Sequence, residues 1–474
     1  MKESTPMNLL TEAQIKKIND TALALLSNTG IHLPHPAARQ LLLKRGAKED
    51  ADGRVLIPPA MVEDALAIAP AQVPWYDQTG KREFTLAKNR TYFGPGSDSL
   101  YIVDRGTGKV RRAVLQDVID NVRVVEALPQ LDFVMSMGLP IDVEPAKTYP
   151  SVFREMMIHS TKPIIITSTC LADIEIPYEM AKLVAGGEKK LREKPFFITY
   201  IEPESPLKFE SDIVDRIWFC GEHGIPTMGV TAPNLGGGGP VTMEGALAQG
   251  TAESLAALVI LQLRYPGAGF VFGANSWATD MRSAIVCYGS PEVGTSTAAY
   301  AAMARFYGLP AWGGAGCTDA QYLDAQAGEE AAQSILLALQ GGTSIAHDVG
   351  FLAYGSLYDA RFLILNDEMI ARTRHILRPF ELTEEGLAQS VIDTVARASI
   401  KGKGPTIYLK HPHTAKNFKQ ALYMPPLYIE RGTLKPESPG KPLLEKLGKQ
   451  VEKILSPEAE PTLPEAVVNR LYPF

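Results

Sequence analysis

Residues 195–233 read PFFITYIEPESPLKFESDIVDRIWFCGEHGIPTMGVTAP, and this stretch decides the fold class. Its two ends, 195–203 and 226–233, are apolar runs without alternation, which is typical of parallel strands buried on both faces. The residues between them, 209–223, carry apolar positions at helical spacing. A strand, a helix and a second strand in this order form a βαβ unit, which indicates an α/β fold.

The same unit repeats along most of the chain. Eight buried strands alternating with helices is the count of a (β/α)8 TIM barrel. The alternative, a doubly wound sheet, ordinarily carries a phosphate fingerprint after its first strand, and NLGGGGPVT at 234–242 lacks the spacing of such a motif. The predicted strands are 131–138, 162–169, 195–203, 226–233, 269–276, 310–316, 343–347 and 405–411. The predicted helices are 149–160, 172–186, 209–223, 241–264, 291–307, 320–340, 358–376 and 384–400.

Two segments are expected to flank the barrel. Residues 1–113 combine helical patterns with short β-type runs, which predicts an N-terminal α+β extension. Residues 114–429 are the predicted barrel domain. Residues 430–474 are rich in Lys, Glu and Pro and carry one amphipathic helix at 441–455, so we expect a helical tail that wraps the outside.

The composition is that of a soluble globular protein, with 45% hydrophobic and 21% charged residues in 474. A net charge of −6 gives no basic surface for nucleic acid. The chain has no uninterrupted apolar run of about 18 residues, so the sequence predicts no membrane-spanning helix. Its N-terminus does not resemble a signal peptide. We therefore expect a cytoplasmic protein. The cysteines form no zinc or dithiol pattern and are expected to be free thiols. They are Cys170, Cys220, Cys287 and Cys317.

Barrel enzymes place their chemistry at the C-terminal ends of the strands. Each polar or aromatic residue there also has a structural alternative: Asp319 could only cap a helix, and His347 could be a hydrogen-bonded structural histidine. The sequence shows no zinc-protease motif, nucleophile elbow or strand-end lysine for Schiff-base chemistry. Aromatic rings with a few carboxylates suit a cation, since each ring face attracts ammonium by about 0.5–2 kcal/mol. The candidates are Tyr200, Glu202, Asn234, Asn275, Ser276, Trp277, Trp312, Thr318, Asp319, His347, Asp348, Phe351, Tyr354, His411 and His413.

A longer motif lies at 313–352, GGAGCTDAQYLDAQAGEEAAQSILLALQGGTSIAHDVGFL, and it resembles the trimethylamine methyltransferase family. Members carry a Gly-Gly segment, spaced aspartates, a Gln-Ala-Gly run, a helix and a glycine-rich strand. GPGSDSLYIVD (94–104), IEPESPL (201–207) and HPHTAKNF (411–418) extend the resemblance over nearly the whole chain. The residues that fit the longer motif are Asp319, Asp324, Gln326, Ala327, Gly328 and Glu329.

The resemblance implies a methyltransferase. Founding members carry pyrrolysine and demethylate trimethylamine, and their pyrrolysine is expected near the end of the seventh strand, close to His347. Because this chain has standard residues throughout, it is similar to the non-pyrrolysine branch, which acts on quaternary amines such as glycine betaine. The methyl group would pass to the Co(I) corrinoid (cobalamin) of a separate partner protein, releasing dimethylglycine, as in the methyl metabolism of methanogens and acetogens.

Several alternatives stay open. The substrate could be proline betaine, carnitine or γ-butyrobetaine, and the chain could be a non-catalytic betaine-binding protein on the same scaffold. No metal or cofactor is expected to be held tightly by the chain itself. Barrels of this size commonly pair, so a homodimer is one option.

We hypothesise roles for eight side chains in binding the substrate. Aromatic faces would contact the ammonium group, Glu202 or Asp319 would add negative charge, and His347 with Arg282 would bind the carboxylate of a betaine. A quaternary nitrogen leaves as a neutral amine, so no acid–base pair is required. Orientation by His347, Asp319 and Glu202 would be the main contribution, worth up to about 7–11 kcal/mol in well-aligned reactions. The aromatic faces assigned to the ammonium are those of Tyr101, Trp277, Phe351 and Tyr354.

Overall fold

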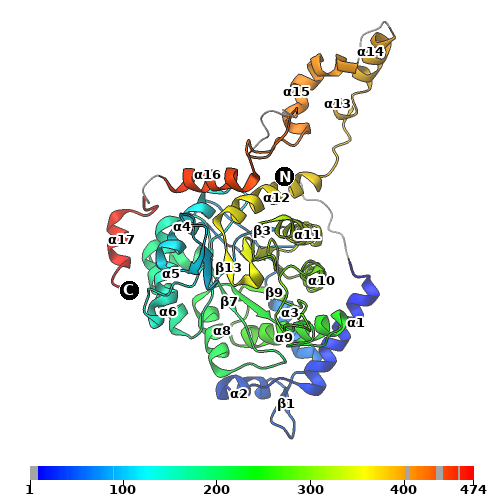
Figure 1. The fold of residues 1–474 in the computed structure, drawn as a ribbon. Coiled ribbons are helices and arrows are strands. Elements are labelled where there is room, and N and C mark those ends of the chain that lie inside the picture. The colour runs from blue at the N-terminus through cyan, green and yellow to red at the C-terminus, as the bar shows by residue number, and fades with distance from the viewer. Residues whose placement is uncertain (1–8, 89, 401–404, 434–440, 457–459) are drawn as a thin grey trace.

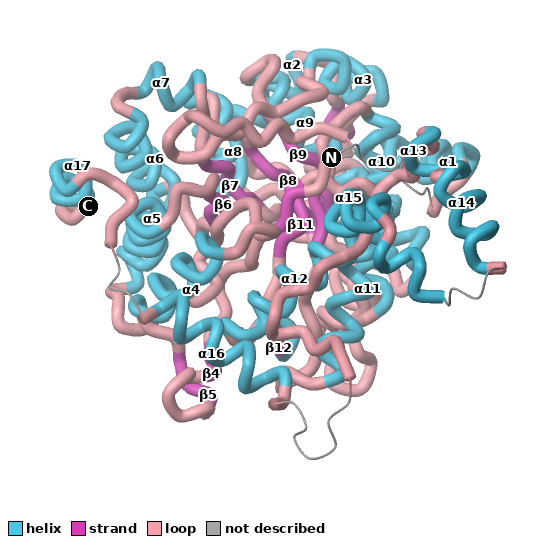
Figure 2. Tube along the Cα trace, turned by 90° about the horizontal axis from the view of Figure 1, so that it is seen from above, coloured by secondary structure: helices cyan, strands magenta, loops and turns pink. Residues whose placement is uncertain are grey.

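The computed structural model describes residues 9–88, 90–400, 405–433, 441–456 and 460–474. Parallel strands lie at the centre and helices surround them (Figures 1 and 2). The central strands are β3 (Tyr92–Phe93), β6 (Ile164–Ile166), β7 (Phe197–Ile201), β8 (Thr227–Thr231), β9 (Phe270–Ala274), β10 (Trp312–Gly314) and β11 (Ile345–His347), together with the segment 131–136.

Hydrogen bonding closes these strands into a barrel. β6, β7, β8 and β9 pair in parallel in that order, and β10, β11 and β3 form a second parallel set. Single parallel bridges join Phe272 to Ala311 and Val134 to Ile164. The N–H of Asp132 donates to the carbonyl of Phe93 over 2.6 Å, which closes the remaining gap. The predicted (β/α)8 barrel is confirmed.

Seven of the eight predicted helices are confirmed, with ends that differ by at most five residues. The eighth, 384–400, is divided at Ala388 into two helices, α13 (Glu384–Leu387) and α14 (Gln389–Ser399). The seven form because their apolar positions recur at helical spacing and face the strands. Glu188–Glu193 (α7) is an additional short helix that was not predicted. The confirmed helices are α5 (Thr148–His159), α6 (Ala172–Ala185), α8 (Ser211–His223), α9 (Met243–Arg264), α10 (Pro291–Tyr307), α11 (Ala325–Gly341) and α12 (Ala360–Ile376).

The predicted eighth strand is wrong. Residues Pro405–Lys410 form a 3-10 helix (η4), and His411 accepts the N–H of His413 over 3.1 Å as the cap of the next helix, α15 (Pro412–Ala421). The eighth strand of the barrel is β3, which comes from the segment that was predicted to precede the barrel. The run PTIYLKH has the composition of a strand. It forms no barrel strand because it lies after α12, in a segment that extends away from the barrel (Figure 1).

A hairpin from the N-terminal region closes one end of the barrel. Antiparallel bridges join Val73 to Leu86 and Tyr76 to Glu83. The N–H of Tyr76 donates to the carbonyl of Pro195, which precedes β7, so the hairpin lies at the N-terminal ends of the strands. Its apolar side chains continue the core inside the barrel, which leaves the opposite end as the accessible one. That core consists of Val73, Trp75, Phe84, Leu86, Phe133, Met135, Ile165, Ile198, Met228, Val230, Val271, Trp312 and Ile345.

Three N-terminal helices cover the outside of α9. They are α1 (Glu12–Ala24), which continues as a π-helical turn (η1, Leu25–Thr29), α2 (Pro36–Lys44) and α3 (Pro59–Ile68). By length and composition α9 could cross a membrane, a possibility not expected from the sequence. However, 89% of its apolar window is buried inside the protein, as in the core helix of a soluble fold.

A small sheet lies at the accessible end of the barrel. Its strands are β12 (Phe351–Leu352), β13 (Leu357–Tyr358), β4 (Tyr101–Val103) and β5 (Val110–Arg112), in that order. The 3-10 turn η3 (Ala353–Gly355) links β12 to β13. The remaining short elements are β1 (Lys48–Glu49), β2 (Val55–Leu56) and η2 (Pro145–Lys147).

The C-terminal helices lie on the outside of the barrel. α16 (Leu443–Leu455) packs on α12 and on α4 (Leu115–Ala127), and α17 (Glu465–Leu471) packs on α6. α13 (Glu384–Leu387), α14 (Gln389–Ser399) and α15 project away from the barrel (Figure 1). A division of the chain into separate units at residues 113 and 429 stays a prediction.

Candidate functional site

A cavity of about 330 Å³ lies at the C-terminal ends of the barrel strands. Seven of the eight strands, or the loops that follow them, contribute a lining residue, because parallel strands end at the same edge of the barrel. The lining residues are Ser97, Asp98, Met135, Thr167, Tyr200, Glu202, Ala232, Asn234, Asn275, Trp277, Val286, Tyr288, His347, Asp348, Phe351 and Gly355.

Three carboxylates face this cavity: Asp98, Glu202 and Asp348. Among the described residues that line it there is no Lys or Arg. Desolvation inside the cavity raises the pKa of Glu202, although the residue remains accessible to solvent, while the hydroxyl of Tyr200, which donates to its Oε2 over 3.1 Å, acts in the opposite direction. Burial also raises the pKa of Asp98, which accepts a hydrogen bond from Ser97 over 3.0 Å. The cavity therefore concentrates negative charge that a bound cation would stabilise.

His347 stands between aromatic rings at the edge of the cavity. Its ring centroid lies 4.5 Å from that of Trp312 and 5.7 Å from that of Tyr200. Its Nδ1 lies 2.9 Å from Oδ1 of Asp348, but the two groups are not aligned as a hydrogen bond, and within the described part of the chain neither ring nitrogen has a hydrogen-bond partner. A buried polar nitrogen without a partner is costly, so these nitrogens are available to a ligand.

Aromatic rings form one wall of the cavity. The rings of Trp277 and Tyr288 meet edge-on with centroids 4.4 Å apart, and Phe351 lies 6.3 Å from Tyr288. Glycines make room for two of these rings. A Cβ on Gly314 would lie 2.5 Å from the indole of Trp277, and one on Gly96 would lie 2.3 Å from the ring of Phe351. Any larger residue at these positions would displace the wall.

Four of the eight residues predicted to bind the substrate line the cavity: Glu202, Trp277, His347 and Phe351. The other four lie outside its lining. Tyr101 is 38% exposed on β4 beneath the guanidinium of Arg112, and Tyr354 is also exposed. The side chain of Arg282 is 91% exposed and pairs with Asp280, because the loop that carries it turns outward.

The fourth of these residues, Asp319, supports the cavity from behind. Its Oδ1 accepts the backbone N–H of Tyr288 over 2.7 Å, and its own N–H donates to Glu330 over 3.0 Å. Asp324 caps α11 by accepting from Gln326, whose side chain donates to Glu330. Much of the motif at 313–352 therefore holds the loops in place. Asp319 was also considered as a possible helix cap, but the residue that caps a helix is Asp324.

The sequence reasoning missed Asp98 and Tyr288 as cavity residues. Asp98 lies in the piece GPGSDSLYIVD, which was noted only as part of the resemblance, because the two residues of β3 gave no sign of a barrel strand. Tyr288 lies 14 residues after the end of β9, in a loop that folds back over the cavity. No local pattern could place it there. Burial and the nearby Asp348 raise the pKa of the Tyr288 hydroxyl well above its usual value.

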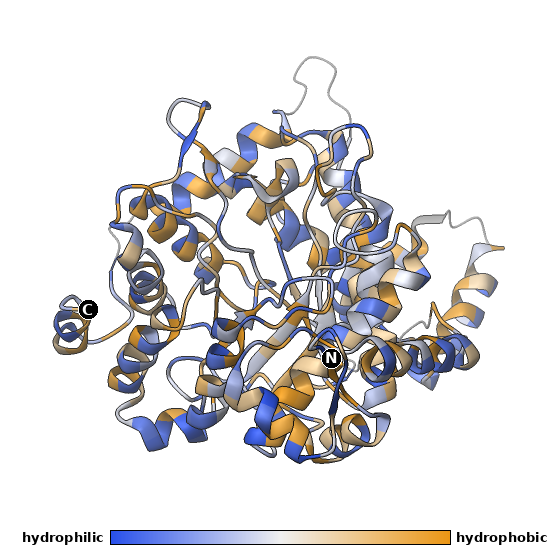
Figure 3. Ribbon diagram, turned by 90° about the horizontal axis from the view of Figure 1, so that it is seen from below, coloured by the Kyte–Doolittle hydropathy of each residue, from blue (hydrophilic) through white to orange (hydrophobic). Residues whose placement is uncertain are grey.

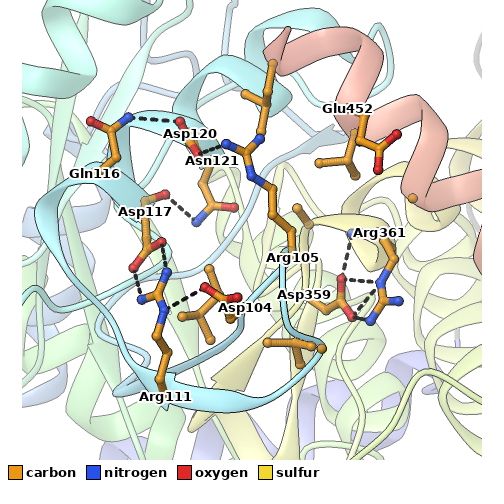
Figure 4. A pocket seen from close by; sticks show the side chains of 18 of the residues that line it. Asp104, Arg105, Arg111, Gln116, Asp117, Asp120, Asn121, Asp359, Arg361 and Glu452 are labelled. Atoms are coloured by element: carbon orange, nitrogen blue, oxygen red, sulfur yellow. Dashed lines mark hydrogen bonds and ion pairs between the residues drawn. The ribbon is translucent and has the colours of Figure 1, made fainter.

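A second cavity, of about 490 Å³, lies between the β4–β5 hairpin, α4 and α16 (Figure 4). Its arginines are already paired: Arg111 binds Asp117 through two nitrogens at 2.6 and 2.8 Å and Asp104 at 2.8 Å. None of its lining residues lies on a strand of the barrel, whereas Tyr200 and His347 of the first cavity do. The cavity at the strand ends is therefore the candidate active site. Across the described residues, no group of three or more His, Cys, Asp or Glu side chains is placed to hold a metal ion.

The chain is similar to known methyltransferases. It is 28% identical over 422 residues to glycine betaine methyltransferase of Desulfitobacterium hafniense strain Y51, covering 89% of this chain and 86% of the relative. Over 389 residues it is 28% identical to trimethylamine methyltransferase MttB of strain DSM 10664 / DCB-2 of the same species, covering 82% and 78%.

A solved structure shows the fold, and a family model shows the family. The structure of monomethylamine methyltransferase MtmB from Methanosarcina barkeri matches with a TM-score of 0.51 and 13% identity, over 93% of this chain and 92% of that one, and shows a shared fold. A family model for trimethylamine methyltransferase (MTTB) matches residues 1–474. The chain therefore belongs to the trimethylamine methyltransferase family.

Proposed function

We propose that the chain demethylates a quaternary amine, with glycine betaine as the first candidate, and passes the methyl group to the Co(I) corrinoid of a partner protein. The observation that carries this proposal is a cavity lined by aromatic rings and three carboxylates, without Lys or Arg among its described lining residues, at the mouth of a barrel of this family. Such a cavity attracts a permanent cation through ring faces and negative charge.

The ammonium end of the substrate would lie between the aromatic wall and the carboxylates. Phe351, Tyr288 and Trp277 offer aromatic rings, and Asp98 offers a carboxyl that a bound cation would favour in its ionised form. Removing water from this space strengthens the interaction between the cation and the carboxylates. The rings and the three carboxylates together supply the attraction.

The carboxylate end of a betaine requires donors, and the cavity has them. The indole N–H of Trp277 and the ring nitrogens of His347 have no hydrogen-bond partners among the described residues. Arg282, which was expected to help His347, points outward, so Trp277 takes its place in our proposal. The cavity volume of about 330 Å³ accommodates a small betaine.

The transfer breaks one N–CH3 bond and forms one Co–CH3 bond. The electron pair of the broken bond stays on nitrogen, which leaves as a neutral tertiary amine, so no proton moves. The reduced corrinoid supplies the nucleophile. The residues of the cavity bind the cation, orient its methyl group toward the open end and exclude water. Weak ring contacts suit this task, because a tightly held cation would lose stabilisation as its charge disappears.

Free Co(I) cobalamin tests the proposal, because methylcobalamin forms with a distinct absorbance. We expect methylation with glycine betaine in a panel that includes proline betaine, carnitine, γ-butyrobetaine and trimethylamine. Glu202→Gln should lower the rate, and Glu204→Gln, an exposed carboxylate on the same loop, is the matched control. Turnover of another betaine alone would change the substrate. Binding of betaine without turnover would assign a binding protein, and equal rates for both variants would remove Glu202 from the site.

We further propose that the protein works in the cytoplasm, where reduced corrinoids and their partner proteins operate, without nucleic-acid or membrane partners. The acidic net charge of −6 and the burial of α9 inside the protein support this.

A further inference from the structure

The helix α9 carries a buried carboxylate that the proposed function does not use. This helix is predominantly hydrophobic (Figure 3), and 89% of its most apolar stretch is buried inside the protein. Glu253 lies in the middle of the helix and is only 1% exposed. A carboxylate taken out of water is costly unless hydrogen-bond donors surround it, so Glu253 requires a specific set of partners.

Two of these partners belong to the loop that follows β7. Oε1 of Glu253 accepts the backbone N–H of Leu207 over 2.9 Å, and its Oε2 accepts the hydroxyl of Ser205 over 2.8 Å. Leu207 has a φ of 56°, in the left-handed region that a leucine rarely adopts, so its hydrogen bond to Glu253 stabilises an unfavourable backbone conformation. The loop starts directly after Glu202. Its geometry therefore determines how Glu202 faces the cavity.

The loop that follows β8 is connected to the same carboxylate. Nε2 of Gln249, one turn earlier on α9, donates to Oε1 of Glu253 over 2.9 Å and to the carbonyl of Gly238 over 2.9 Å. The two loops touch at Gly238, since a Cβ there would lie 3.4 Å from the Cβ of Ser205. Asn234, near the start of this second loop, lines the cavity. Glu253 therefore lies where α9 holds two neighbouring loops of the candidate active site.

Glu253 does not itself line the cavity. Its two oxygens already accept hydrogen bonds from three donors, so a substrate has no need of it as a direct partner. Burial raises the pKa of Glu253, which shows that a charge at this place is unfavourable. The hydrogen bonds of this residue, more than its charge, connect it to the cavity.

We propose that Glu253 is a positioning residue for methyl transfer, which holds the loop after β7 so that Glu202 faces the bound quaternary ammonium group. This inference rests on the proposed function, because that function assigns Glu202 to the cation. A neutral Gln at position 253 would keep an acceptor for the N–H of Leu207 and would gain a donor for the hydroxyl oxygen of Ser205. Gln should therefore replace Glu253, whereas Ala should not.

Hydrogen exchange of the empty protein, followed by mass spectrometry, tests the structural step without a ligand. We expect the peptide that covers residues 203–210 to exchange faster in Glu253→Ala than in the wild type, because the N–H of Leu207 loses its acceptor. Glu253→Gln should exchange like the wild type. Glu244→Ala, which removes an exposed carboxylate from the same helix, is the matched control and should also leave the exchange unchanged. Unchanged exchange in Glu253→Ala would overturn the proposal.

A double-mutant cycle with Glu202→Gln tests the functional step. Tryptophan fluorescence follows the binding of glycine betaine, or of the amine in the panel that the wild type demethylates. Glu253→Ala should weaken this binding by about tenfold, as Glu202→Gln does, and Glu253→Gln should restore it to within about twofold of the wild type. The variant that combines Glu202→Gln with Glu253→Ala should lose no more than either single change, because Glu253 acts through Glu202.

Two results of the cycle would overturn the proposal. Additive losses would show that Glu253 supports the fold without acting through Glu202, and an equal loss in Glu253→Gln and Glu253→Ala would show that its charge acts on the cation. A wild type that binds and demethylates no quaternary amine would overturn the proposed function, while the exchange measurement would still show whether Glu253 holds the loop. If Glu253→Ala does not fold, Ser205→Ala removes one of the three donors at a partly exposed position and should cause smaller changes in the same direction.

Discussion

At the scale of single residues, the carboxyls that line the cavity couple ligand binding to pH. Burial raises the pKa values of Glu202 and Asp98, so the folded protein binds more protons at these groups than the unfolded chain does. The empty protein therefore loses stability as pH rises from the ordinary carboxyl pKa through the raised values. A bound ammonium favours the ionised carboxylates. We expect the increase in melting temperature caused by glycine betaine to grow from about pH 5 to about pH 8, measured by differential scanning calorimetry.

Glu202→Gln separates the two effects, because it keeps the size of the side chain and removes its ionisation. The variant should melt at a higher temperature than the wild type when empty at about pH 8, and it should bind the amine on the order of tenfold more weakly. Glu204→Gln should change neither quantity. A thermal shift that is the same at both pH values in the wild type would show that these carboxyls do not contact the cation.

His347 is expected to bind the carboxylate of the substrate. Loss of a hydrogen bond to a charged group costs about 1.5–3 kcal/mol, so His347→Ala should raise the KM for glycine betaine by about 10- to 150-fold. A quaternary amine without a carboxylate, such as tetramethylammonium, should show little change, and His347→Gln should restore part of the loss by supplying an N–H donor. Steady-state kinetics with both substrates checks this, and equal losses for the two would remove the assigned role.

At the scale of elements, the hairpin between Val73 and Leu86 stabilises the closed end of the barrel. Trp75 is fully buried there, with ring centroids 5.6 Å from Phe133 and 6.3 Å from Phe84. Trp75→Ala should lower the free energy of unfolding by about 3–5 kcal/mol, measured by urea denaturation. Trp75→Phe should cost less, because a ring remains and the buried indole N–H, which has no described partner, is removed. A loss below about 1 kcal/mol for the alanine variant would contradict this role.

The sequence predicts some strands of the barrel well and others not at all, for physical reasons. The first seven predicted strands are uninterrupted apolar runs because helices or the barrel interior bury both faces, and that burial can be recognised locally. The two residues of β3 leave too little pattern to recognise, since pairing with β11 supplies the order that the local sequence lacks. The run at 405–411 shows the reverse, because strand-like composition forms η4 where no strand edge is near.

The residues of the candidate site also differ in how well the sequence predicts them. Glu202 and His347 lie at or directly after strands, so the register of the strand places them in the cavity. Tyr288 and Arg282 share one long loop after β9, where the hydrogen bond from the backbone N–H of Tyr288 to Asp319 helps to hold Tyr288 inward while Arg282 is exposed. Such a bond joins residues from different βα loops and leaves no local signal in the sequence.

At the scale of the whole molecule, we expect from the proposed function that a corrinoid partner docks on the rim of the barrel mouth. A Cβ on Gly236 would lie 2.4 Å from Met281 and 3.7 Å from Val241, so these two exposed side chains are neighbours on the loops after β8 and β9. Met281 is 67% exposed and lies outside the lining of the cavity. Exposed apolar side chains beside a site commonly contact the partner that uses it.

Met281→Glu should therefore slow methyl transfer to the protein-bound corrinoid by about tenfold or more, the cost of losing one well-packed interface side chain. Transfer to free Co(I) cobalamin should stay within about twofold of the wild type, because the small acceptor needs no docking surface. Ile68→Glu serves as the control on a distant face. Parallel assays with the two acceptors provide the measurement. Equal slowing with both acceptors would mean that Met281 shapes the cavity itself, and no slowing with either would move the docking surface to another part of the rim.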